Sequence, residues 1–149
     1  MIPLELWYSH DQTEGDVART HDELDAALDR IAALSRLDWP ALATVHQTGN
    51  KFGPLLHVGL HVEQGALLYS GDDDEEGSYT AGSGTQEGDP LLYMYMTSDS
   101  EFPPNSEVPA TLIRQAAHEF ADTGLRPTCV QWQTWDWSGA DTESEWPEL

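Results

Sequence analysis

His61-Val62-Glu63 is the first pattern in the chain with the residue types of a catalytic site. In zinc-dependent nucleic-acid deaminases a histidine at this spacing binds the metal and the glutamate transfers protons. Two cysteines complete the zinc site of those enzymes, whereas Cys129 is the single cysteine here. We therefore interpret the pattern as part of a half-exposed strand edge.

Two further patterns resemble metal sites only in part. His57 and His61 lie in a predicted strand, where four residues span about 13 Å, too far for both rings to bind one metal. The run that begins at Asp72 matches the first, third and sixth positions of a calcium-binding EF-hand loop, but Ser83 stands at the twelfth. A weak divalent-ion site stays open there, and a dedicated calcium sensor is not supported.

Phosphate binding and nucleophilic catalysis also lack a suitable set of residues. The glycines at 82, 84 and 88 have the wrong spacing for a phosphate loop, and Asp89-Pro90 blocks the helix that must follow. No nucleophile-elbow pattern surrounds a serine. We interpret Cys129 as a buried structural thiol in a strand. The sequence therefore predicts no enzyme, no cofactor and no catalytic residues.

The charge of the chain selects the kind of partner. Six Lys and Arg residues face 27 Asp and Glu residues, which gives a formal net charge of −21. Such a protein repels nucleic acid and anionic membranes and attracts basic protein surfaces. We expect a protein partner and no direct binding of nucleic acid or membrane. A role of the charge in solubility alone remains the alternative.

Acidic residues interleaved with aromatic ones form the candidate partner-binding surface. The charges would steer the encounter and mimic phosphates, and the aromatic rings would anchor the complex. The alternative is a solvated loop and a frayed tail. The candidate residues are Asp72, Asp73, Asp74, Glu75, Glu76, Tyr79, Asp99, Glu101, Trp135 and Trp137.

Local sequence patterns predict two helices that position this surface. Thr20 and Glu23 form a capping box at the start of a helix over residues 21–35. Pro109 suits the start of a second helix, and Gly124 suits its end. Apolar residues recur at helical spacing. The predicted buried residues are Leu24, Ala27, Leu28, Ile31 and Leu34 in the first helix and Leu112, Ile113, Ala116, Ala117 and Phe120 in the second.

Strands are predicted over residues 4–8, 41–48, 55–62, 66–70, 91–96 and 128–133. The almost wholly apolar run at 91–96 indicates a central position in the sheet. Residues 71–89 are predicted to form a long surface loop and 99–109 an acidic, proline-rich connection. The fold class is α+β, with a mostly antiparallel sheet of about five to six strands and two main helices packed on one face.

A chain of 149 residues suits one domain. We assign residues 1–133 to this domain and 134–149 to an acidic, tryptophan-containing tail. No signal-peptide pattern and no apolar run of membrane-spanning length occurs, and the single cysteine suits a reducing compartment. We expect a cytoplasmic protein.

Several motifs of the second half together resemble a known family. They are the apolar run at 91–96, Glu101-Phe102-Pro103-Pro104 with Val108-Pro109, and Arg126-Pro127-Thr128 followed by Trp132. Their order is similar to the deaminase-associated immunity-protein family of bacterial polymorphic toxin systems, over about residues 4–133. The resemblance implies an α+β fold, with Trp132 as the family's tryptophan near the C-terminus.

The resemblance also implies a function. Members bind a cognate toxin, usually of the deaminase superfamily, and protect the producing cell. We expect an immunity protein that neutralises a zinc-dependent DNA cytosine deaminase by occluding its basic substrate cleft. The alternatives are an acidic nucleic-acid mimic that inhibits a nuclease-type toxin or another DNA-binding protein, a small enzyme with scattered catalytic residues, and a subunit of a secretion assembly.

Overall fold

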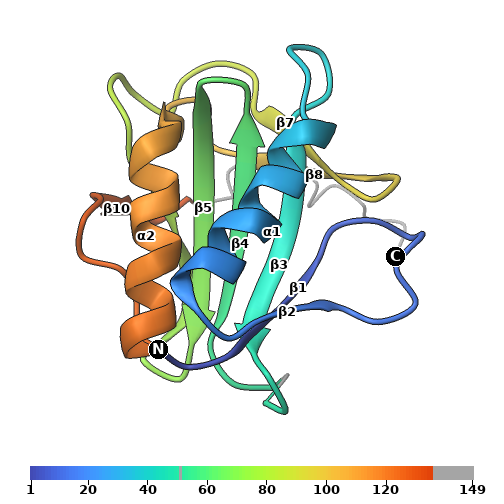
Figure 1. Cartoon of the computed structure of the whole chain (residues 1–149). Coiled ribbons are helices and arrows are strands. Elements are labelled where there is room, and N and C mark those ends of the chain that lie inside the picture. Colours follow the sequence, from blue (N-terminus) through green and yellow to red (C-terminus); the bar gives the residue numbers. More distant parts are fainter. Residues whose placement is uncertain (51, 136–149) are drawn as a thin grey trace, which may run out of the picture.

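A computed structural model describes residues 1–50 and 52–135, and it places two helices in front of one open sheet (Figure 1). The helices are α1 (His21–Leu34) and α2 (Ala110–Thr123). The strands of the described residues are β1 (Leu4–Trp7), β2 (Asp16–Ala18), β3 (Ala41–Gln47), β4 (Leu55–His61), β5 (Gln64–Gly71), β6 (Asp74–Thr80), β7 (Leu91–Tyr95), β8 (Ser98–Phe102), β9 (Val108–Pro109) and β10 (Trp132–Gln133).

The main path of the sheet runs in the order β10-β6-β5-β4-β3-β1-β2. All neighbours on this path are antiparallel. β9 pairs with β5, and β7 joins β8 in a hairpin off the path. The α+β class and the mostly antiparallel sheet are confirmed, but ten strands in the described residues exceed the five to six expected.

Helix α1 begins with a hydrogen-bonded cap. The Thr20 hydroxyl accepts from the backbone N–H of Glu23 at 3.1 Å, as predicted. The Glu23 carboxylate, however, accepts from the backbone N–H of Arg19 at 2.7 Å, one residue before the expected Thr20. The side chains of α1 that are buried against the sheet are Leu24, Ala27, Leu28 and Ile31, whereas Leu34 is 37% exposed.

Helix α2 ends at Gly124, as predicted from the sequence. Gly124 has φ of +70°, a conformation that favours glycine, and its N–H bonds to the carbonyl of Phe120 at 2.8 Å. Pro109 is the residue before the first turn. Both helices share one core with the sheet residues Leu56, Val58 and Leu60, so both lie on the same face (Figure 1).

The opposite face of the sheet carries the β7–β8 hairpin. An added Cβ on Gly59 of β4 would lie 2.6 Å from the ring of Tyr93, so glycine lets the β7 ring pack directly on the strand. Tyr93 and Phe102 are buried there with Leu42 and Ala66. The expected central position of residues 91–96 is wrong: β7 meets β3 only through a parallel pairing of Met94, and its apolar residues instead cover the sheet.

The long loop expected at 71–89 is wrong in part, because residues 74–80 form strand β6. Its first half is acidic and lacks apolar alternation, but it pairs with β5 and β10. Gly77 has φ of +86° at the point where the β5–β6 register shifts. Small residues let this strand pack in the interior: Gly77, Ser78 and Thr80 are buried. Likewise, β8 and β9 occupy part of the connection expected at 99–109.

The strand expected at 128–133 is shortened to β10. The carboxylate of Glu119 on α2 accepts from the N–H of Thr128 at 2.8 Å and from the N–H of Cys129 at 3.2 Å. These two N–H groups therefore do not form inter-strand hydrogen bonds. Burial opposes ionisation of Glu119, but the hydrogen bonds from Thr128 and Cys129 outweigh it and lower the pKa of Glu119.

Candidate functional site

The acidic turn, residues 72–76, comprises the two-residue connection from β5 to β6 and the first three residues of β6. The buried Tyr69 places its hydroxyl 2.8 Å from the carboxylate of Asp73 and donates to it. Arg126 reaches the carboxylate of Asp74 at 3.4 Å. These two of the five predicted acidic residues therefore stabilise the hairpin itself. The exposed carboxylates left for a partner are Asp72, Glu75 and Glu76.

Tyr79 lies between two other aromatic rings on the face opposite the helices. Its ring centroid is 5.3 Å from that of Phe102 and 5.6 Å from that of Trp135, at interplanar angles of 83° and 88°. Such edge-to-face pairs are favourable contacts. Phe102 is buried, whereas Tyr79 and Trp135 are half-buried. Two predicted contact residues that are far apart in the sequence thus meet.

Asp99 and Glu101 stand on the outer side of the β7–β8 hairpin. Their cross-strand partners are Met94 and Leu92, and Leu92 is 45% exposed. Both carboxylates are exposed, and neither forms an ion pair with a cation in residues 1–50 and 52–135. Side chains alternate along β8, so Phe102 points toward Tyr79 while Asp99 and Glu101 point outward on the same side of the molecule. We call Tyr79, Asp99, Glu101 and Trp135 the acidic–aromatic face.

The acidic turn lies apart from the hairpin acids Asp99 and Glu101, although Tyr79 follows it by three residues on β6. Met94 pairs with Ala41 at one end of β3, whereas the turn follows Ser70, which pairs with Leu55 at the other end of the central strands. Figure 1 shows the turn at the lower end of the sheet and the hairpin at the upper right. Strand β5 separates them by about 23 Å at ~3.3 Å per residue. Trp137 lies outside the described residues.

Residues 81–90, which connect β6 to β7, add acids that were not selected from the sequence. The amide of Gln86 donates to the Gln133 side chain and to the Thr134 carbonyl, both at 2.7 Å. The exposed Glu87 therefore lies near Trp135. The glycine-rich composition predicts a loop but not the part of the molecule that the loop contacts. Glu87 therefore becomes a candidate contact residue only through the long-range hydrogen bonds of Gln86.

His61 is a structural residue in this fold. Its Nδ1 lies 2.7 Å from the Glu107 carboxylate and its Nε2 lies 2.8 Å from the carbonyl of Leu37. Burial acts to lower the pKa of His61, but these two hydrogen bonds outweigh it and the pKa is raised. Tyr93 donates its hydroxyl to the same carboxylate at 2.7 Å. The three side chains fasten β4, the hairpin and the segment before α2.

The other candidates for chemistry are also embedded in the fold. Burial lowers the pKa of His57 to about 4. Cys129 is half-buried, and burial together with the charge of Glu119 raises its pKa, which disfavours the reactive thiolate. Within the described residues, no three or more His, Cys, Asp and Glu side chains are grouped to hold a metal. No helix described for this chain is long and apolar enough to cross a membrane.

Comparison with known proteins identifies the family. No curated protein matches the chain. The family model described as Immunity protein Imm1 matches residues 12–134. The match extends from before β2 to just after β10 and contains the acidic turn, Tyr79, Asp99 and Glu101. The resemblance to an immunity-protein family of toxin systems is therefore confirmed, and the chain belongs to the Immunity protein Imm1 family.

Proposed function

We propose that this protein neutralises a cognate toxin that acts on nucleic acid, and that it does so by filling the toxin's basic substrate cleft. Membership of the family supports the toxin-neutralising role. The target class rests on one observation: the exposed carboxylates of Asp99 and Glu101 lie on the same side of the sheet as the aromatic pair of Tyr79 and Trp135. The target we favour is a zinc-dependent DNA cytosine deaminase in the cytoplasm.

A nucleic-acid deaminase has two features that this surface complements. It needs a basic channel for the phosphates and a pocket for the flipped base. Carboxylates satisfy the first, and an aromatic ring with an apolar edge suits the second. The net charge of −21 adds long-range attraction to any such channel.

The two acidic features suit one interface of ordinary size. A standard interface covers about 800 Å² per partner, a patch roughly 30 Å across. The ~23 Å along β5 between the acidic turn and the level of the hairpin acids Asp99 and Glu101 fits within it. The two features would then have different roles: the exposed acids of the turn accelerate association, and the packed Tyr79 cluster slows dissociation.

The experiment begins with co-expression of this chain and the toxin domain encoded next to it. We expect a stable complex with a Kd at or below about 1 nM, or −12 kcal/mol, and loss of deamination in its presence. A complex with a toxin that shows nuclease rather than deaminase activity would overturn the deaminase assignment and retain the nucleic-acid class. Failure to form any complex would overturn the inhibitor proposal.

Charge-matched variants then test the binding surface. Asp99→Asn with Glu101→Gln should weaken binding at least about tenfold, mainly through dissociation. Asp72→Asn with Glu76→Gln should slow association roughly threefold or more at low salt and have little effect at high salt. The control, Asp22→Asn with Asp29→Asn, removes two exposed charges from α1 on the opposite side. Equal effects of all three pairs would show that net charge alone acts.

A further inference from the structure

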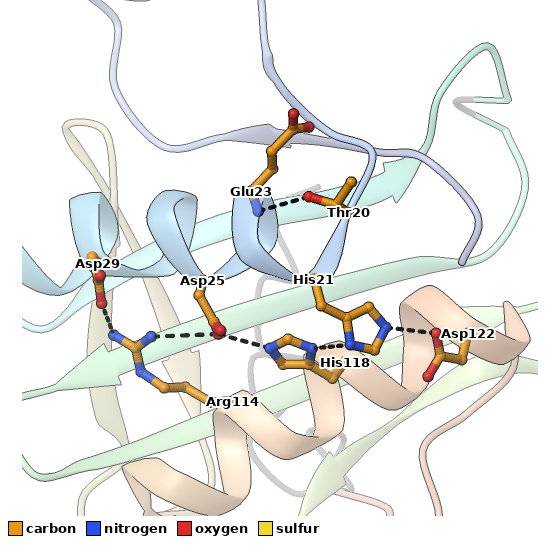
Figure 2. A network of polar contacts seen from close by, with 8 residues as sticks. All are labelled: Thr20, His21, Glu23, Asp25, Asp29, Arg114, His118 and Asp122. Atoms are coloured by element: carbon orange, nitrogen blue, oxygen red, sulfur yellow. Dashed lines mark hydrogen bonds and ion pairs between the residues drawn. The ribbon is translucent and has the colours of Figure 1, made fainter.

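Two histidines meet on the outer side of the helix pair. His21 is the first residue of α1, and His118 lies in α2. Their Nδ1 atoms are 3.1 Å apart, and their ring centroids are 4.6 Å apart at an interplanar angle of 63°. Figure 2 shows both rings with their Nδ1 atoms directed at each other. Rings that met end to end across this Nδ1 contact would have centroids farther apart than 4.6 Å, so the two rings meet at an angle.

Each ring is held from behind by a carboxylate. Nε2 of His21 lies 2.8 Å from Asp122, and Nε2 of His118 lies 2.7 Å from Asp25. A carboxylate accepts hydrogen bonds, so each Nε2 carries a proton and donates it.

This arrangement brings two Nδ1 lone pairs close together. In a neutral imidazole with a protonated Nε2, the Nδ1 atom is an acceptor. Two acceptors at 3.1 Å repel unless a cation lies between them. Either one shared proton or a metal ion satisfies both nitrogens.

We propose that His21 and His118 form a two-histidine site for a divalent late transition metal such as Ni²⁺, Cu²⁺ or Zn²⁺. A histidine that binds a metal through one nitrogen and donates from the other to a carboxylate is the usual arrangement in protein metal sites, and both rings have it. Metal–nitrogen bonds of about 2.0–2.1 Å across the 3.1 Å separation give an angle of roughly 95–100° at the metal. Imidazole pairs suit these ions.

The surroundings favour a cation at this place. Asp25, Asp29 and Asp122 supply three negative charges, whereas Arg114, which bonds Asp29 at 2.7 Å and approaches Asp25 at 4.0 Å, supplies one positive side chain. The N-terminal amino group also acts electrostatically on Asp122. The His21 side chain is 48% exposed, so water can complete the coordination. Bound metal would link the start of α1 to α2.

The site is separate from the acidic–aromatic face. The helices cover one side of the sheet and the β7–β8 hairpin covers the other (Figure 1). Metal binding can therefore be measured without any toxin.

Calorimetric titration of the full chain with NiCl₂ tests the proposal. Excess Mg²⁺ occupies nonspecific carboxylates, and about 0.15 M salt screens them. We expect one ion per chain, a higher melting temperature with metal, and at least about tenfold weaker binding for His21→Gln or His118→Gln. Asp122→Asn should weaken binding about 10- to 100-fold. His10→Gln, another exposed histidine, and Asp29→Asn, a network carboxylate that bonds no histidine, are the controls.

Spectroscopy of the unaltered protein provides a second readout that no folding defect can affect. Zn²⁺ should shift the Nδ1 resonances of His21 and His118 together, at one equivalent. Absence of saturable binding, or a proton shared between the two Nδ1 atoms that metal does not displace, would overturn the proposal. Unchanged affinity in the His21→Gln, His118→Gln double variant would do the same.

Discussion

Gly59→Ala tests how the β7–β8 hairpin is seated on the sheet. The new Cβ would lie 2.6 Å from Cδ2 and Cε2 of Tyr93 and 3.2 Å from the carbonyl oxygen of Ala66. The Tyr93 ring is fully buried, tilted against Phe102 and bonded through its hydroxyl to Glu107. The Tyr93 ring therefore has no space into which it can move. To admit the new Cβ, either the hairpin must shift away from β4 or the ring must change its rotamer.

The expected magnitude combines two opposing effects. Overpacking of a dense core costs about 1–3 kcal/mol. Alanine also restricts the unfolded chain more than glycine does, which returns about 0.4–1 kcal/mol. The net loss should be roughly 1–2.5 kcal/mol in the free energy of unfolding, which lowers the melting temperature of a chain this size by about 3–8 °C.

Urea denaturation of a double-mutant cycle isolates the clash. In a Tyr93→Val background the ring atoms nearest Gly59 are gone, so Gly59→Ala should be neutral or stabilise by up to about 1 kcal/mol. The coupling energy should then be about 1–3 kcal/mol, with unchanged m-values. An alanine that costs the same in both backgrounds would refute the idea that Tyr93 presses on this strand.

Three further perturbations test the embedded titratable groups. Unfolded His57 binds its proton near its ordinary pKa of 6.5 and the folded residue near 4. Stability should therefore fall as the pH is lowered through this window, by at most about 1.4 kcal/mol per unit. Urea denaturation of His57→Leu should show that slope removed, and parallel curves would contradict the assignment. Glu107→Gln should lower the pKa of His61 measured by NMR, and it should cost more stability at pH 6 than at pH 8. The stabilisation is present below the pKa of unfolded His61 and is lost as pH rises through the raised pKa of the folded residue. An unchanged pKa of His61 would show that Glu107 does not raise it. Glu119→Gln should accelerate iodoacetamide alkylation of Cys129, because a neighbouring negative charge that raises the thiol pKa is removed, and an unchanged rate would leave burial as the sole cause.

Sequence patterns that depend only on neighbouring residues predicted the helix ends and the strand alternation correctly. The cap at Thr20 and the stop at Gly124 depend on local hydrogen bonds, and both form. Strand β4 alternates clearly, with Leu56, Val58 and Leu60 toward the helices. Each of these features is encoded in residues that are neighbours in the chain.

The errors arise where a distant group determines the outcome. The strand expected at 128–133 loses its first residues because a carboxylate on α2, Glu119, takes their N–H donors. Strand β6 forms from a polar sequence because β5 and β10 pair with it. The candidate surface divides for the same reason: Tyr79 and Trp135 meet across 56 positions, whereas the acidic turn lies at the far end of the sheet.

The outer strands of this sheet also bear on how the protein behaves at high concentration. The main path ends in the short strands β2 and β10, and the part of β6 that β10 does not cover begins with the acids Asp74, Glu75 and Glu76, which oppose pairing with another copy of the chain. Within the described part of the chain β8 pairs only with β7, but Asp99 and Glu101 repel an approaching strand of the same protein. A stoichiometric inhibitor has to be stored in at least the amount of its target, and these edges resist the aggregation that such storage invites.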